Sequence, residues 1–297
     1  MFDPSIRVNE IQLGSQVKRL SLGNTLTPSV SMLPSFAGNR NVNWSSADPA
    51  VASVDPVTGR VKGSGVGSTT ITATAADGGG ATASYTIDVI EGPAAHYTFD
   101  GNLKNANSLF GAGTITGNHI DSAGGTVTFA SGVSDQAAVF DGNSGVRLPN
   151  GLISGNNYSV SIWVNPAQLT TYTPAFFGAK DGNNWVSLVP QGSAGNQTMV
   201  WSGSSWYDAP TGMSIPAGEW THLAFTVEKG SIRVYVNGAA KFAGTNFPDV
   251  FSAAGAIFGL AVNWWDTPFK GMMDDMRVYD GALSPAAVAG LAGISQP

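Results

Sequence analysis

Two adjacent carboxylates, Asp274 and Asp275, lie in the segment Gly271-Met-Met-Asp-Asp-Met-Arg-Val-Tyr-Asp280. A pair of carboxylates could act as the acid and base of glycoside hydrolysis only if both faced one cleft. Neighbouring residues on a regular β-strand point to opposite faces of the sheet, so these two cannot form a facing pair. The pair therefore does not indicate catalysis.

Other residue types that carry catalysis are sparse and dispersed. The chain contains no cysteine, which excludes thiol chemistry and cysteine-ligated zinc. No Gly-x-Ser-x-Gly, phosphate-binding loop or His-Glu-x-x-His motif is present. We therefore predict that the protein is not an enzyme. The glutamates and histidines are scattered and belong to no such motif, at Glu10, Glu91, Glu219, Glu228, His96, His119 and His222.

Two pairs of adjacent aromatic residues lie in polar segments with the composition of loops. Loops run over the protein surface, where two neighbouring rings are hard to bury together. Exposed rings are costly unless they are used, and sugar C–H faces stack on them while nearby Asp and Asn side chains bond the hydroxyls. We expect at least one ring to fold down onto the protein and the others to mark a ligand surface. The predicted surface comprises Trp206, Tyr207, Asp208, Asn263, Trp264, Trp265 and Asp266.

The remaining tryptophans of this half divide by strand phase. We expect Trp163 and Trp220 in the core, whereas Trp185 and Trp201 could either pack or be presented. The polar loop Lys180–Asn184 is another segment that could contribute to a ligand surface.

The composition indicates that these side chains are positioned by short strands joined by tight turns. Hydrophobic residues make up 42% and charged residues 11%, which argues against disorder, and 38 Gly with 16 Pro are typical of turn-rich β-proteins. The 14 basic residues are scattered in a chain of net charge −6, so no nucleic-acid partner is indicated. No apolar run is long enough to span a membrane, and Met1-Phe-Asp-Pro4 lacks the pattern of a secretory leader.

Residues 1–91 resemble the bacterial immunoglobulin-like group 2 family. The resemblance is carried, in order, by Asn43-Trp-Ser-Ser-Ala-Asp48, Val51-Ala-Ser-Val54, Gly59-Arg-Val-Lys-Gly63 and Gly67-Ser-Thr-Thr-Ile-Thr-Ala73. It implies an Ig-like β-sandwich that serves as a spacer or adhesion module, without catalytic residues. Trp44 is then expected in the core of this sandwich.

Residues 92–297, after the strand-breaking Glu91-Gly-Pro93, resemble the laminin-G-like, concanavalin-like lectin/glucanase family. The ordered motifs include Tyr97-Thr-Phe-Asp-Gly-Asn102, Ser159-Val-Ser-Ile-Trp-Val-Asn-Pro166, Val234-Tyr-Val-Asn-Gly238 and the segment from Gly271 to Ser284. The expected fold is therefore all-β, an Ig-like sandwich followed by a concanavalin-like jelly roll. Such a protein binds carbohydrate, protein or lipid surfaces, and it often accompanies bacterial glycoside hydrolases.

This second resemblance also implies a structural calcium site where the first and last strands of the jelly roll meet. Calcium prefers carboxylate, amide and carbonyl oxygens, and the residue types fit this preference. The alternative is that Asp100-Gly-Asn102 is only a hairpin turn and that one aspartate is solvated. The predicted ligands are Asp100, Asn102, Asp274 and Asp275.

We thus predict a non-catalytic, extracellular or cell-surface protein of bacterial or phage origin that binds a glycan or polysaccharide by aromatic stacking. Two alternatives stay open. The chain could be a structural decoration or adhesion subunit on a virion surface, contacting a surface protein or capsid. It could also be the accessory region of a secreted glycoside hydrolase. The Met273, Met276 and Val278 side chains all face the core only if a β-bulge lies near the two aspartates.

Overall fold

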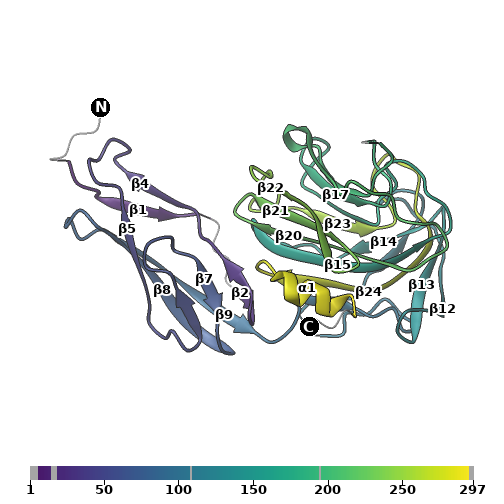
Figure 1. The fold of residues 1–297 in the computed structure, drawn as a ribbon, viewed down its shortest axis with the longest axis horizontal. Helices are drawn as coiled ribbons and strands as arrows, with labels where there is room; N and C mark the ends of the chain where they lie inside the picture. The colour runs from purple at the N-terminus through teal and green to yellow at the C-terminus, as the bar shows by residue number, and fades with distance from the viewer. Residues whose placement is uncertain (1–5, 15–18, 108, 194, 294–297) are drawn as a thin grey trace.

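The computed structural model describes residues 6–14, 19–107, 109–193 and 195–293. It consists of two β-sandwiches in series, with the smaller one at the N-terminus (Figure 1). The predicted all-β fold, an Ig-like sandwich followed by a jelly roll, is confirmed. None of the helices in the described ranges is long and apolar enough to cross a membrane.

The N-terminal sandwich consists of a four-stranded, a three-stranded and a two-stranded sheet, ordered β2-β9-β8-β5, β3-β7-β6 and β1-β4. Trp44 is buried in its core, as predicted, and Gly59 at φ +73° passes so close that an added Cβ would lie 2.5 Å from the indole. The strands are β1 (Glu10–Leu13), β2 (Arg19–Ser21), β3 (Thr25–Leu26), β4 (Val30–Leu33), β5 (Val42–Ser46), β6 (Ala52–Val54), β7 (Val61–Gly63), β8 (Gly67–Ala75) and β9 (Thr82–Ile90).

The C-terminal sandwich pairs an eight-stranded sheet with a seven-stranded sheet. The eight-stranded sheet runs β12-β13-β24-β15-β20-β21-β22, with β10 also paired to β24. Its strands are β10 (Ala95–Tyr97), β12 (Val127–Ser131), β13 (Gln136–Asp141), β15 (Asn157–Pro166), β20 (Thr221–Glu228), β21 (Ser231–Val236), β22 (Ala239–Gly244) and β24 (Lys270–Asp280).

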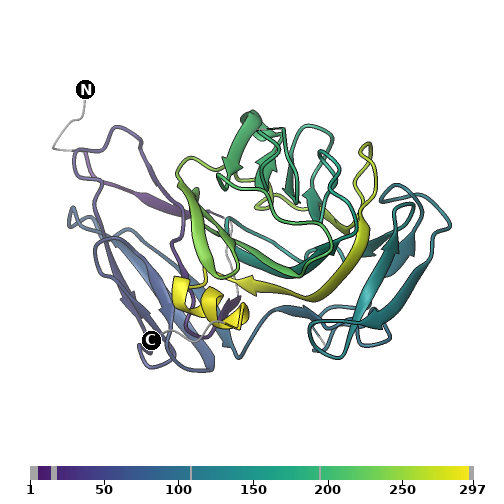
Figure 2. The same ribbon diagram turned by 45° about the vertical axis from the view of Figure 1, so that its right-hand side comes forward.

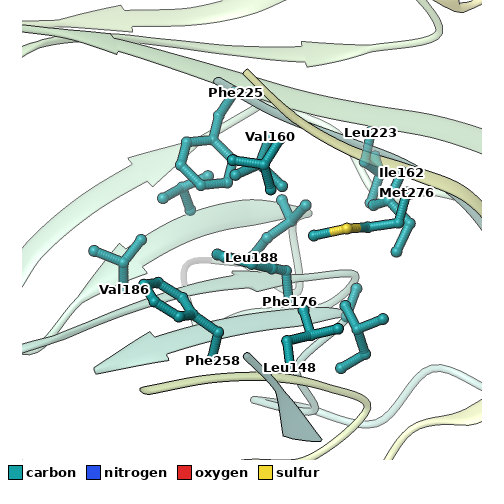
Figure 3. Close-up of a cluster of buried hydrophobic side chains, with 14 of the residues drawn as sticks. Leu148, Val160, Ile162, Phe176, Val186, Leu188, Leu223, Phe225, Phe258 and Met276 are labelled. Atoms are coloured by element: carbon teal, nitrogen blue, oxygen red, sulfur yellow. The ribbon is translucent and has the colours of Figure 1, made fainter. Parts of the chain in front are cut away.

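The seven-stranded sheet runs β11-β14-β23-β16-β17-β18-β19. Its strands are β11 (Thr114–Thr116), β14 (Gly145–Leu148), β16 (Phe176–Ala179), β17 (Trp185–Val189), β18 (Met199–Ser202), β19 (Tyr207–Pro210) and β23 (Ile257–Leu260). The main core lies between the two large sheets, as Figure 3 shows for side chains such as Val160, Leu188 and Phe258.

The last strand contains the β-bulge that its apolar phase predicts. Two steps along β15, from Ser161 to Trp163, oppose three steps along β24, from Arg277 back to Asp274. Asp275 takes a left-handed conformation with φ +53° at this point. The extra residue restores the phase, so that Met273 and Met276 both face the core.

Helix α1 (Pro285–Leu291) follows β24 and lies against the outer face of the eight-stranded sheet (Figures 1 and 2). Ser284 caps it by accepting a hydrogen bond from the Ala287 amide at 3.2 Å, and Pro285 occupies the first turn. Val288 packs against Tyr235 and Tyr279, which covers part of this face with apolar surface.

The two sandwiches meet through a polar joint. Arg19 forms an ion pair with Asp280 at the end of β24, and the Asn24 amide donates to the Asp280 carbonyl at 3.2 Å. The Ala282 amide donates to the Thr25 carbonyl at 2.9 Å. These contacts hold the end of β24 against the start of the N-terminal sandwich.

A second part of the joint is centred on Glu228 at the end of β20. Its carboxylate accepts from Arg60 Nε at 2.9 Å and from Arg60 Nη2 at 2.8 Å. The hydroxyls of Thr25 and Thr27 donate to the same carboxylate at 3.3 and 3.1 Å. A bidentate Arg–carboxylate pair with two further donors fixes direction as well as distance between the two sandwiches.

Candidate functional site

The outer face of the seven-stranded sheet carries a second, separate apolar cluster. Alternate residues of β16, β17 and β18 turn away from the main core, and loops from elsewhere in the chain pack over them. The buried members are Ile120, Phe177, Ala179, Trp185 and Val262, with Trp201, Ile257 and Trp264 packed against them.

Seven rings on this face form a continuous array, and we call the six other than the fully buried Phe177 the aromatic platform. Trp185 is buried at its centre and contacts Trp201 edge to face, with ring centroids 4.7 Å apart at 89°. Trp265 and Trp206 lie 5.9 and 6.5 Å from Trp185. Trp206 is 72% exposed and Trp265 45% exposed. The platform consists of Tyr172, Trp185, Trp201, Trp206, Trp264 and Trp265.

Trp206 is presented by a strained turn between β18 and β19. The 3-10 turn η1 (Ser204–Trp206) places both Ser205, at φ +58°, and Trp206, at φ +47°, in the left-handed region. This conformation is unfavourable for a bulky residue, and such strain persists where the surroundings hold it. Gly203 precedes the turn, and a Cβ there would collide with the Trp185 indole.

Trp264 and Trp265 are positioned by the side chain of Asn263. Its Oδ1 accepts from the Trp265 amide at 3.0 Å and from the Asp266 amide at 2.7 Å. Its Nδ2 donates to the Asp266 carboxylate at 2.7 Å. Asn263 is buried, so it orients the loop from beneath, while burial raises the pKa of Asp266 against the opposing hydrogen bond from Asn263.

The edge of the platform carries further polar groups. Trp264 Nε1 donates to the exposed Asp121 carboxylate at 3.2 Å, and the Arg147 guanidinium lies 3.8 Å from the same carboxylate. Asp208 is exposed and pairs in register with Trp201 across β18 and β19, so both side chains stand on the outer face.

Tyr207 lies on the opposite face from its neighbours Trp206 and Asp208. Its ring contacts Phe247 edge to face at 5.2 Å and packs against the main core. It is therefore the predicted ring that folds down onto the protein. Burial raises the pKa of its hydroxyl.

The structure thus brings five of the seven predicted ligand residues to one face, and it places Asn263 buried beneath this face and Tyr207 behind it. Tyr172 and Asp121 were missed because single residues in loops carry no pattern. The loop Lys180–Asn184 is a tight turn between β16 and β17, in which Asp181 accepts from the Asn183 and Asn184 amides at 2.9 Å. These bonds lower the pKa of the Asp181 carboxyl.

The prediction that Trp163 and Trp220 are core residues is wrong. Val160, Ile162 and Val164 of β15 face the core, so Trp163 faces outwards, where its ring lies tilted beside that of His222 with centroids 5.3 Å apart. Trp220 precedes β20 and is only half-buried. In both cases the tryptophan is one position out of phase with the core-facing residues of β15 or β20.

The two adjacent aspartates have different surroundings. Asp274 is fully buried; its Oδ2 accepts from the Val133 and Ser134 amides at 2.8 and 3.1 Å, and its Oδ1 has no partner among the described residues. Burial raises the pKa of Asp274. Burial also opposes ionisation of Asp275, but hydrogen bonds and charge from His96 and Arg277 outweigh it and hold the pKa of Asp275 below its ordinary value.

The predicted calcium ligands converge only in part. Strands β10 and β24 pair as expected. Asp274 accepts from amides of the turn before β13, and Asp100 accepts from the Gln136 amide at the start of β13. Asn102 is committed to a turn, accepting from the Lys104 amide and donating to the Asp100 carbonyl, each at 2.8 Å. Asp275 is neutralised by Arg277. The unpaired, buried Oδ1 of Asp274 is one oxygen of the kind that calcium binds, whereas a calcium site takes about six to eight.

A serine–histidine pair lies on the outer face of the eight-stranded sheet. Ser161 Oγ and His222 Nε2 are 2.8 Å apart, and both residues are buried. Burial, together with the charge of Arg277, lowers the pKa of His222 to about 4. A nucleophile must reach its substrate, and the buried Ser161 hydroxyl is not accessible to one.

Comparison with known proteins places both halves. Residues 7–86 match the family of bacterial Ig-like domains (group 2). An Ig-like virion protein of Serratia phage KSP90 is 36% identical over 73 residues, which are 25% of this chain and 28% of that protein. The match therefore covers much less than two thirds of the length of that relative.

The C-terminal sandwich is similar to a solved structure, domain 4 of AbnA, a GH43 extracellular arabinanase from Geobacillus stearothermophilus, in complex with arabinotriose. The identity is 60%, the TM-score 0.66, and the match covers 67% of this chain and 98% of that domain. Residues 140–289, half of the chain, match the family model of the concanavalin A-like lectin/glucanases. The chain therefore belongs to the concanavalin A-like lectin/glucanases superfamily.

Proposed function

We propose that the chain is a non-catalytic binding protein for an extracellular neutral polysaccharide, with arabinan as the first candidate. The aromatic platform carries this proposal. Two of its tryptophans, Trp206 and Trp265, are exposed, and both pack on a third, Trp185, which is buried. The exposed rings are therefore held in place by a buried ring. Large exposed rings grouped on one face indicate a site of interaction.

The chemistry of the platform suits a sugar chain. Ring faces stack on the C–H faces of sugars, and the carboxylates at the rim accept hydrogen bonds from hydroxyl groups. Asp208, Asp121 and Asp266 supply three such acceptors around the rings. The strained turn under Trp206 supports the same role, because backbone strain is concentrated at functional sites.

The similarity to the arabinanase domain supplies the choice of ligand. That domain was solved with arabinotriose, and it is 60% identical to this chain. We therefore take arabinotriose and linear arabinan as the probes. The extracellular source of that enzyme also supports a location outside the cell, where the chain would serve as an accessory region of a secreted glycoside hydrolase.

The test is isothermal titration of the full chain with arabinotriose. Trp206→Ala and Trp265→Ala are each expected to weaken binding about tenfold, corresponding to roughly 1.4 kcal/mol for one lost stacking ring. Phe36→Ala is the control, because Phe36 is 52% exposed but lies in the N-terminal sandwich. Unchanged affinity in both tryptophan variants would exclude the platform as the site.

Calcium binding stays a prediction within this function. The observation that supports it is the buried, unpaired Oδ1 of Asp274. Millimolar calcium should raise the melting temperature of the chain, and the Asp274→Asn variant should lose this increase. Equal melting temperatures in calcium and in a chelator would contradict it.

A second candidate function is that of a surface subunit on a virion. The 36% identity with an Ig-like virion protein supports it, although the match is confined to 73 residues. In that case the platform would contact protein. No detectable binding to a panel of neutral glycans, together with concentration-dependent self-assembly, would favour the virion function. Glycan binding by a monomer would favour the polysaccharide-binding function.

A further inference from the structure

A polar groove lies at the joint between the two sandwiches. It has a volume of about 560 Å³, which is in the size range of ligand pockets. The turn between β20 and β21 and the end of β22 form one side, and residues of the N-terminal sandwich form the other. It shares no lining residue with the aromatic platform. Its polar lining includes Thr27, Arg60, Lys229, Ser231, Arg233 and Thr245.

The groove is positively charged in a chain of net charge −6. Three of the 14 basic residues line it, against one carboxylate, Glu228. That carboxylate is already occupied by the bidentate contact with Arg60 and by two threonine hydroxyls. Arg60 and Glu228 therefore neutralise each other, and the charges of Lys229 and Arg233 remain.

Neither remaining cation has an anionic partner in the ranges that the structure describes. Arg233 and Lys229 occur in none of the ion pairs found there. Lys229 Nζ donates to the Pro28 carbonyl at a long 3.4 Å. Both side chains are exposed to the groove's solvent, so an anion could approach without displacing an existing contact.

We propose that this groove is a second binding site, for a sugar unit that bears a carboxylate. The guanidinium of Arg233 matches a carboxylate with two parallel hydrogen bonds, and Lys229 adds a second charge. Ser231 and Thr245 line the same groove and offer hydroxyls that both donate to and accept from sugar hydroxyls. The site takes uronic-acid units, whereas the platform takes neutral ones.

Both sandwiches line the groove. Thr27 and Arg60 come from the N-terminal sandwich, and the other lining residues come from the C-terminal one. Arg60 and Glu228, which line the groove from opposite sandwiches, are 2.8 Å apart. The joint therefore adds a wall to a site whose free charges come from the C-terminal sandwich.

The test is titration of the full chain with the trimer of galacturonic acid and, separately, with its fully methyl-esterified form. The esterified trimer has the same length but no charge, so we expect at least tenfold weaker binding. Arg233→Ala should weaken trimer binding by at least tenfold, and binding should fall with added salt. Lys104→Ala is the control, because Lys104 is exposed in the same sandwich and away from the groove.

Two further titrations distinguish the groove from the platform and from a general anion site. Trp265→Ala should leave trimer binding unchanged, because the groove and the platform share no residue. Inorganic phosphate should bind more weakly than the trimer; equal or tighter binding would overturn the assignment to a sugar. Equal affinity for the esterified trimer, or no loss in Arg233→Ala, would overturn the proposal as well.

Discussion

His222 is an ionisable side chain held in its neutral form by burial. It is fully buried beside Ser161 and Trp163, and its pKa is lowered to about 4 by burial, with a further contribution from Arg277. The unfolded chain has a histidine with a pKa near 6.5, so it takes up a proton at a higher pH than the folded chain does. Stability is therefore unaffected above that pH and is lost as the pH falls from about 6.5 towards 4.

This linkage predicts acid sensitivity that one substitution removes. Between pH 7 and pH 5 the wild-type chain should lose about 2 kcal/mol of stability through His222. His222→Gln retains a side chain able to hydrogen-bond Ser161 but does not titrate, so its loss over the same range should be smaller by that amount. Urea denaturation at both pH values measures the difference, and parallel losses in the two proteins would refute the assignment to His222.

At the scale of single elements, the bulge in β24 decides how two neighbouring aspartates are used. Asp275 occupies the extra position at φ +53° and binds His96 and Arg277, while Asp274 points to the turn before β13. Replacing Asp275 by either Ala or Gly removes the same two contacts. Only Ala then has a Cβ in a left-handed conformation.

The bulge therefore predicts an unusual order of stability. Asp275→Gly should be more stable than Asp275→Ala by about 1 kcal/mol, because glycine accepts a positive φ without a steric cost. Chemical denaturation of the two variants measures it. At a regular strand position the order is the reverse, so a more stable alanine variant would show that the bulge is absent.

Much of this strand could be predicted from its sequence, whereas the platform could be predicted only in part. The phases of Met273, Met276 and Val278 require one extra residue, and the β-bulge supplies it. Trp185 and Trp201 lie on strands whose two faces are both covered, so alternation alone does not show which ring is presented. The loops that cover this face come from distant segments, whose positions follow from the whole topology.

The turn before η1 offers a further test at this scale. Gly203→Ala should weaken arabinotriose binding several-fold, because the added Cβ collides with Trp185 and displaces the centre of the platform. Gly182→Ala, in the nearby turn between β16 and β17, meets nothing within 4 Å and is the matched control. Equal affinities in the two variants would show that Trp185 does not support the ligand surface.

At the scale of the whole molecule, the joint makes the two sandwiches one body. Glu228→Ala removes the partner of Arg60 and the acceptor of two threonine hydroxyls. We expect the wild-type chain to unfold in one thermal transition and this variant in two, and X-ray scattering in solution to report a broader range of distances between the sandwiches of the variant. Glu219→Ala, which alters an exposed carboxylate away from the joint, should change neither measurement.

The joint also has a mechanical consequence. Any force that pulls the C-terminal sandwich away from the N-terminal one, such as that of the proposed polysaccharide, loads three connections side by side: the chain between β9 and β10, the Arg19–Asp280 pair and the Arg60–Glu228 pair. Force shared in parallel strains each connection less than the same force carried in sequence. The N-terminal sandwich would then act as a stiff lever that keeps the platform facing a fixed direction under tension.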